Sequence, residues 1–190
     1  MLIEPIMTEP DICIIVATDR HGGFSNKNEI PWRIPKDLLH FRQITTHTEL
    51  PKKRNAVIMG RKTFETTGVL KNRINIVLSQ KPINTKEPIT GHYYHCYTMD
   101  AAVELAKQLG SQTIFIIGGE RVYKEAIEKH PVNTIYRTRI DSDYICDRFF
   151  PDIASLPFTC IEQTYGGKDP NDGLSDYWFQ IWKRCPQKPI

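Results

Sequence analysis

The feature that most constrains the fold is an unbroken run of apolar, mostly β-branched residues near the N-terminus, at 12–17 (ICIIVA). A strand with one wet face alternates apolar and polar residues, so a continuous run predicts a strand that is buried on both faces. Comparable strand-like runs follow at 55–59, 74–79 and 113–117, and short helical segments separate them. This alternation predicts an α/β fold in which helices cover both faces of a mostly parallel sheet.

The remaining elements are predicted from local signals. Pro35 suits the first turn of a helix, because its missing N–H group costs nothing there. Asp100 is the expected N-cap of a later helix, which Gly110 would end. Further strands are expected at 92–97, 134–140, 144–150, 158–164 and 177–184, and further helices at 60–67, 101–109 and 120–129, with a polar connection over 43–54. The last two strands flank the turn-rich stretch GGKDPNDG, which predicts an antiparallel hairpin at the edge of the sheet.

Composition and charge exclude several classes of protein. The net charge of +3 is too small for a dedicated nucleic-acid binder, but it is compatible with an anionic small ligand. The longest apolar run is far too short to span a membrane, and the N-terminus lacks the pattern of a signal peptide. Five cysteines without a CxxC pair predict a reduced, cytoplasmic protein. The length of 190 residues predicts one domain over 1–190, with loose termini at 1–10 and 185–190.

Three junctions at the ends of strands carry residues that can bind phosphate. Gly118-Gly119 precedes a helix whose first N–H groups can face an anion, although a tight turn explains the two glycines equally well. The stretch 60–63 (GRKT) combines positive charge, a hydroxyl and a helix start, and 79–81 (SQK) ends the next strand. Each basic residue alone is most simply a solvated surface charge. Because the carboxyl ends of parallel strands meet at one edge of a sheet, the three junctions together favour a polyanionic cofactor.

The stretch 22–42 predicts a lid-like loop that begins with glycine, followed by a helix with one acid, Asp37. An acid in the first turn of a helix can simply stabilise the helix dipole. The functional interpretation depends on Trp32, Leu38 and Phe41, which would line an apolar slot around the carboxylate. Burial would then raise the pKa of Asp37, and a cationic or amidine-like ligand would lower it again.

Other motifs predict no further chemistry. His92 and His95 would point to opposite faces of a strand, so no metal site is expected there. The sequence has no Gly-x-Ser-x-Gly motif and no local signature of a Ser/His/Asp or Cys/His arrangement. The aromatic residues of 177–182 alternate along a strand and are most simply part of the core.

Several motifs, taken in chain order, resemble the dihydrofolate reductase family. They are Pro31-Trp32 with Asp37-Leu38-x-x-Phe41, 57–65 (VIMGRKTFE), 73–79 (RINIVLS), 116–123 (IIGGERVY), 136–140 (YRTRI) and 147–151 (DRFFP). The resemblance implies a three-layer fold with an eight-stranded, mostly parallel sheet, an antiparallel C-terminal hairpin and about four helices. It also implies NADPH-dependent reduction of dihydrofolate to tetrahydrofolate for one-carbon metabolism, with hydride transfer to C6 and protonation at N5.

The resemblance assigns the substrate side of the site to specific residues. Asp37 would hold the amino and ring N–H groups of the pterin and promote protonation of N5. Thr138 would hydrogen-bond to Asp37, and Trp32 would help place an ordered water. Arg73 would pair with the α-carboxylate of the glutamate tail, because a guanidinium matches a carboxylate with two hydrogen bonds. The other implied substrate-binding residues, where antifolates such as methotrexate would also bind, are Leu38, Phe41, Thr67, Leu70 and Ile117.

The same resemblance implies a site for NADPH and a Gly118–Gly119 peptide bond in the cis form. Ala17 and the backbone near Ile30 would meet the nicotinamide amide, and the basic and hydroxyl residues would take the phosphates. The implied cofactor-binding residues are Ala17, Ile30, Gly60, Arg61, Lys62, Thr63, Leu78, Ser79, Gln80, Ile117, Gly118, Gly119, Arg121, Val122 and Tyr123. A monomer is expected, and no part of the chain resembles a thymidylate synthase.

This chain departs from the family pattern at four places. Ser25 replaces a glycine of the lid, Thr67 replaces an apolar residue, and 71–72 (KN) replaces a proline-glycine turn. Gln80 replaces a residue that helps to bind the 2′-phosphate, so a preference for NADPH would rest on Arg61 and Lys62.

Two other functions stay open beside this one. A related pteridine or pyrimidine reductase would keep the cofactor loops but lack the helix that carries Trp32 and Asp37. A cofactor-binding protein without catalysis would lack Asp37 or Thr138. All three residues are present.

Overall fold

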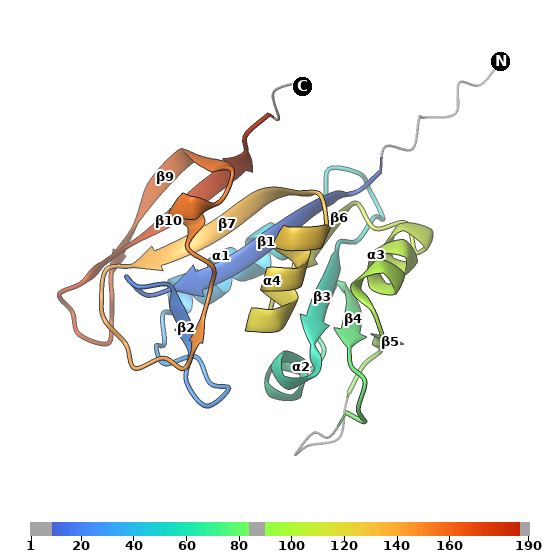
Figure 1. Cartoon of the computed structure of the whole chain (residues 1–190), viewed down its shortest axis with the longest axis horizontal. Helices are drawn as coiled ribbons and strands as arrows, with labels where there is room; N and C mark the ends of the chain where they lie inside the picture. Colours follow the sequence, from blue (N-terminus) through green and yellow to red (C-terminus); the bar gives the residue numbers. More distant parts are fainter. Residues whose placement is uncertain (1–8, 84–89, 187–190) are drawn as a thin grey trace.

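The computed structural model describes residues 9–83 and 90–186. Eight strands form one sheet in the order β5-β4-β3-β6-β1-β7-β10-β9 (Figure 1). Neighbouring strands from β5 to β7 run parallel, whereas β10 is antiparallel to both β7 and β9. The strands are β1 (Asp11–Thr18), β3 (Ala56–Gly60), β4 (Ile74–Leu78), β5 (Tyr94–Cys96), β6 (Thr113–Ile116), β7 (Val132–Ile140), β9 (Phe158–Lys168) and β10 (Asp176–Arg184). The predicted mostly parallel sheet with an antiparallel C-terminal hairpin is confirmed.

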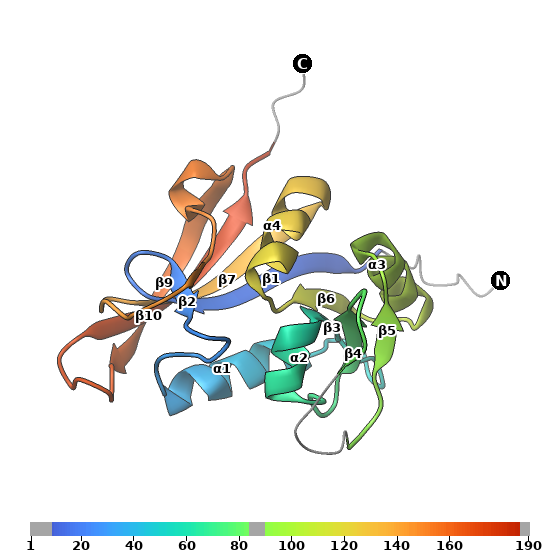
Figure 2. The same cartoon turned by 60° about the horizontal axis from the view of Figure 1, so that its bottom comes forward.

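Helices cover the sheet on both faces, as Figure 2 shows, and give three layers. Helices α3 and α4 lie on one face, and α1 and α2 lie on the other. Their bounds are α1 (Pro35–Thr46), α2 (Arg61–Thr67), α3 (Met99–Gln108) and α4 (Glu120–Lys129), and a short 3-10 helix, η1 (Ile153–Ser155), follows later.

Strand β1 runs through the middle of the core. Ile12, Ile14 and Val16 pack in the cluster that includes α3 and α4, whereas Cys13 and Ile15 pack in the cluster that includes α1 and α2. Both faces of β1 are therefore buried, which confirms the prediction from the unbroken apolar run.

A small second sheet pairs β2 (Gly23–Ser25) with β8 (Arg148–Phe149). It ties the loop after β1 to a segment more than a hundred residues later. The buried carboxylate of Asp19 holds the base of this loop, because Oδ1 accepts hydrogen bonds from the N–H groups of His21 and Gly23. Strand β2 was not predicted. A longer strand was expected at 144–150, of which only the two residues of β8 are in a strand.

Several predicted boundaries were wrong for identifiable reasons. Helix α1 continues to Thr46, into the expected polar connection, because Ile44 packs against the core. Thr98, rather than Asp100, caps α3, and its Oγ1 accepts a hydrogen bond from Ala101 N at 3.2 Å. The helix starts earlier because Met99 belongs to its buried stripe.

The C-terminal hairpin is longer than predicted. Strand β9 continues through Gly166 to Lys168, because the ring of Tyr177 crosses the strand at that point. A Cβ atom on Gly166 would lie 2.2 Å from Tyr177 Cε2, so only glycine fits there. Strand β5 is shorter than the expected 92–97. The expectation of loose termini falls mainly on residues outside the described ranges.

Candidate active site

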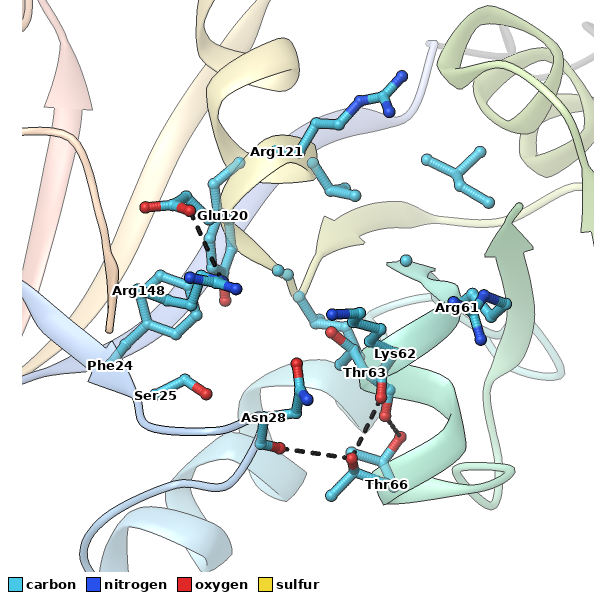
Figure 3. Close-up of a pocket in the computed structure, with 18 of the residues that line it drawn as sticks. Phe24, Ser25, Asn28, Arg61, Lys62, Thr63, Thr66, Glu120, Arg121 and Arg148 are labelled. Atoms are coloured by element: carbon cyan, nitrogen blue, oxygen red, sulfur yellow. Dashed lines mark hydrogen bonds and ion pairs between the residues drawn. The ribbon is translucent and has the colours of Figure 1, made fainter. Parts of the chain in front are cut away.

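A cavity of about 720 Å³ opens where the carboxyl ends of β1, β3, β4 and β6 meet (Figure 3). Ligands of α/β proteins bind at this edge of the sheet. All fifteen residues that the resemblance assigns to the cofactor line this one cavity, from Ala17 on β1 to Tyr123 on α4. The structure therefore brings the three predicted junctions together, although they are far apart in the sequence.

Backbone from two glycine junctions forms part of the cavity wall. Gly60 N donates a hydrogen bond to Gly118 O at 2.7 Å, and a Cβ on Gly60 would lie 3.2 Å from Val122 Cγ2. Gly118 has φ of +116°, a conformation that favours glycine, and its peptide bond to Gly119 is cis, as expected. The starts of α2 and α4 therefore lie against each other at the cavity wall.

Five basic side chains of the described residues line the cavity. Arg61, Lys62 and Arg121 were assigned to the cofactor, and Lys81 was predicted as part of the junction 79–81 without a role of its own. Arg148 was not assigned to the site. Arg148 carried no local signal, because the β2–β8 pairing brings it to the cavity.

Two predicted phosphate-binding side chains already have partners within the protein. Arg61 Nη1 forms an ion pair with Glu65 Oε1 at 2.6 Å, one turn along α2. Gln80 Nε2 donates to Tyr97 O at 2.7 Å and so holds the loop after β5 against the end of β4. Arg61 still lines the cavity, and Gln80 links two segments of its wall.

The lid forms the wall opposite α2. Phe24 packs edge-on against Tyr123 with ring centroids 5.5 Å apart, and Thr66 Oγ1 on α2 reaches Asn28 O at 3.5 Å. Positive φ angles occur at Lys27 (50°) and Asn28 (68°). Ser25 instead lies in β2, where its carbonyl accepts a hydrogen bond from Asp147 N at 2.9 Å. The replacement of glycine by Ser25 therefore falls in extended backbone that any residue can adopt.

Asp37 lies in the first turn of α1, and its carboxylate accepts a hydrogen bond from a strand of the sheet. Thr138 Oγ1 on β7 donates to Asp37 Oδ1 at 2.6 Å, and Thr138 stands in register with the cavity residue Ala17. Burial raises the pKa of Asp37, and the hydrogen bond from Thr138 partly offsets this rise. The hydrogen bond from Thr138 gives Asp37 a partner outside its own helix, beyond any interaction with the helix dipole.

Trp32 also lines the cavity. Its indole is 6% exposed and packs against Tyr144 with ring centroids 5.1 Å apart. Trp32 Nε1 is buried without a hydrogen-bond partner among the described residues. A buried donor of this kind costs free energy unless a ligand or water satisfies it, so the indole is suited to hold a polar group in the cavity.

Arg73 is fixed beside α1 by two hydrogen bonds. Nη1 donates to Thr45 Oγ1 at 2.7 Å and Nε donates to Lys71 O at 3.0 Å. Its guanidinium lies 5.7 Å from the centroid of the Phe41 ring. Burial, followed by the nearby charge of Arg42, lowers the pKa of Arg73. A buried cation beside a second cation is suited to bind an anionic group.

The other predicted substrate-binding residues divide into two groups. Thr67 and Ile117 line the cavity itself, together with Trp32. Phe41 and Leu70 pack at the edge of the core between the sheet and α1 and α2, whereas Leu38 is 56% exposed. In the turn before Arg73, where 71–72 (KN) replaces a proline-glycine turn, Asn72 takes a left-handed φ of 63°.

Comparison with known proteins connects this site to one family. A family model described as dihydrofolate reductase matches residues 11–184. The dihydrofolate reductase of Sus scrofa is 36% identical over 183 residues, which cover 90% of this chain and 96% of that protein. The dihydrofolate reductase of Aedes albopictus is 35% identical over 152 residues, or 75% of this chain and 80% of that protein. The bifunctional dihydrofolate reductase-thymidylate synthase of Glycine max is 34% identical over 182 residues, which span only 33% of that longer protein. The chain belongs to the dihydrofolate reductase family.

Proposed function

We propose that this protein reduces dihydrofolate to tetrahydrofolate with NADPH. The observation that carries the proposal is the hydrogen bond between Thr138 and the half-buried carboxylate of Asp37. Thr138 pairs in the sheet with Ala17, which lines a cavity with several basic side chains. The carboxylate suits a nitrogen-rich, cationic or amidine-like ring, and the basic rim suits a polyanion. A cofactor-binding protein without catalysis has no need of the Asp37–Thr138 pair.

Asp37 would bind the pterin through two N–H groups and favour the protonated state at N5. The carboxylate that Thr138 holds can accept both N–H groups and stabilise a positive charge on the pterin, and a bound cationic ring would offset the rise in pKa that burial causes. Thr138 would fix the orientation of the carboxylate. Trp32 Nε1, a buried donor, would hold a water or polar atom next to the reacting ring. Arg73 would bind the negatively charged glutamate tail.

The residues around the cavity fit a nicotinamide dinucleotide. Arg61, Lys62 and Arg121 would meet its phosphates, and the glycine backbone at the starts of α2 and α4 allows a close approach. Ala17 and Ile30 would border the nicotinamide end. The cofactor, when bound, would supply the hydride that is transferred to C6 of dihydrofolate.

We further propose that residues 1–190 act as one monomeric domain in the cytoplasm. One continuous sheet from β5 to β9 supports a single domain. The five cysteines are free thiols, which suits a reducing compartment. Among the described residues, no helix is long and apolar enough to cross a membrane.

The direct test is an assay of NADPH oxidation at 340 nm with dihydrofolate, with and without methotrexate. We expect oxidation that depends on dihydrofolate and that methotrexate abolishes. A parallel assay with a dihydropterin that lacks the glutamate tail tests the alternative of a pteridine reductase. Efficient reduction of the tailless pterin together with inactivity toward dihydrofolate would favour that alternative.

Replacement of Arg61 by alanine is expected to weaken NADPH binding about tenfold while changing NADH binding little. The reason is that the 2′-phosphate of NADPH, which NADH lacks, gains a charge-assisted hydrogen bond from the guanidinium. Dissociation constants from fluorescence titration check this, with Lys124→Ala on the exposed side of α4 as the control. An unchanged NADPH/NADH ratio would move the 2′-phosphate site to another residue.

A further inference from the structure

We propose that Arg148 is a cofactor-binding residue that contacts the diphosphate bridge of the dinucleotide. This inference rests on the proposed function, because it adds a residue to the cofactor site. Arg148 stands in β8 in register with Ser25 of the lid strand β2. Its side chain lines the same cavity as the start of α4, and Figure 3 shows it beside Glu120 and Phe24, away from Arg61.

Glu120 holds Arg148 in this position only weakly. Glu120 is the first residue of α4, and its Oε1 accepts a hydrogen bond from Phe149 N at 3.1 Å. Its Oε2 lies 3.9 Å from Arg148 Nε, and the two side chains are 44% and 43% exposed. A long ion pair that is this exposed contributes little to stability, because water screens it. The contact can therefore be exchanged for a better one.

Glu120 places a negative charge at the start of α4, where a phosphate would otherwise bind well, and the positive charge of Arg148 lies beside it. The N-terminal end of a helix attracts anions, and a carboxylate at that end opposes an anionic ligand in the same cavity. Arg148 lies 3.9 Å from this carboxylate on the lid side and partly offsets its charge. Its Nη1 also donates to Asp147 O at 2.7 Å and lies 4.0 Å from Asp147 Oδ2, so the guanidinium is anchored at the cavity wall. An anchored guanidinium can form two parallel hydrogen bonds with a phosphate.

The location of Arg148 selects the diphosphate bridge over the 2′-phosphate. Of the other cavity cations, Arg121 follows Glu120 on α4, whereas the rest lie on α2 and after β4, at Arg61, Lys62 and Lys81. Arg148 instead shares its part of the wall with the first residue of α4, where the helix end favours phosphate. The diphosphate is common to NADPH and NADH, so its contacts strengthen both cofactors alike.

The test measures dissociation constants of NADPH and NADH for Arg148→Gln and Arg148→Lys by fluorescence titration at two salt concentrations. We expect Arg148→Gln to weaken both cofactors about tenfold with an unchanged ratio and a smaller salt dependence. Arg148→Lys should bind both cofactors with intermediate affinity, since lysine keeps the charge but cannot form two parallel hydrogen bonds with a phosphate. Lys124→Gln, which removes the same charge from the exposed side of α4, should match the wild type.

The variant Glu120→Gln tests whether Arg148 binds the cofactor or only forms an ion pair with Glu120. It should tighten both cofactors about threefold, because it removes a carboxylate from the helix N-terminus and frees Arg148. The proposal would be overturned if Glu120→Gln weakened cofactor binding as much as Arg148→Gln does. It would also be overturned if Arg148→Gln bound both cofactors with wild-type affinity, or if it changed the NADPH/NADH ratio. A wild-type protein that binds neither nucleotide would contradict the proposed function itself, whereas the other outcomes leave that function intact.

Discussion

Replacement of Asp37 by asparagine should lower turnover with dihydrofolate at least about 100-fold at neutral pH, while the fold is retained. Asparagine can still accept the hydrogen bond from Thr138 Oγ1, which Asp37 Oδ1 accepts at 2.6 Å. It cannot carry the negative charge that stabilises a protonated pterin. The loss should be smallest at low pH, because substrate can then arrive already protonated.

The same variant should be more stable than the wild type at neutral pH. The folded-state pKa of Asp37 is raised by burial, so between the ordinary aspartate pKa and this raised value the native state binds more protons than the unfolded state. Wild-type stability therefore falls as pH rises through that window, and the lost stability is not regained at higher pH. An asparagine does not titrate, so the difference in free energy of unfolding should grow with pH and then level off. Urea denaturation between pH 4 and 8 measures it.

Two further variants separate the charge from the fold. Asp37→Glu keeps a carboxylate on α1 and should retain much more activity than the asparagine variant. Asp100→Asn makes the same chemical change in the first turn of α3, where the side chain is 92% exposed, and should change neither turnover nor its pH profile. Full activity of Asp37→Asn at neutral pH would contradict the proposed role of the carboxylate.

The fold was predictable wherever burial leaves a recognisable pattern of apolar residues in the sequence. The unbroken apolar run at 12–17 predicted a strand covered on both faces, and β1 has that environment. The bounds of α4, which follows Gly118-Gly119, were also predicted correctly. Strand β2 escaped prediction and the bounds of β8 were predicted too long, because two or three residues cannot show a period. Their pairing depends on long-range hydrogen bonds that local sequence does not encode.

The site was predictable to the extent that its residues sit at strand ends. The cofactor junctions could be found because parallel strands bring their carboxyl ends together. Arg148 could not be found in this way, since the small β2–β8 sheet carries it to the cavity. The pairing of Asp37 with Thr138 also needed more than local pattern, because the two residues lie 101 positions apart. The family resemblance, rather than periodicity, supplied that pair.

Replacement of Arg73 by leucine should weaken ligands with a glutamate tail about 100-fold, and tailless inhibitors much less. Arg73 is held by Thr45 Oγ1 and Lys71 O, so its guanidinium is already oriented and loses little entropy on binding a carboxylate. Burial and the neighbouring charge of Arg42 lower its pKa, and the negative charge of a bound carboxylate would oppose this shift. Binding constants for methotrexate and for a small diaminopyrimidine measure the contrast.

The contrast between the two ligands isolates the tail contact from any general disturbance of α1. Leucine keeps the apolar packing against the Phe41 ring but removes the charge, which lies 5.7 Å from the ring centroid. Arg42→Leu removes a neighbouring charge from the exposed side of α1, so its smaller loss would show that general attraction cannot account for the effect of Arg73. Equal weakening of both ligands by Arg73→Leu would mean that the substitution distorts the pterin pocket, and the tail would then need another anchor. Because a fixed guanidinium recognises a carboxylate by geometry as well as charge, Arg73→Lys should recover only part of the lost affinity.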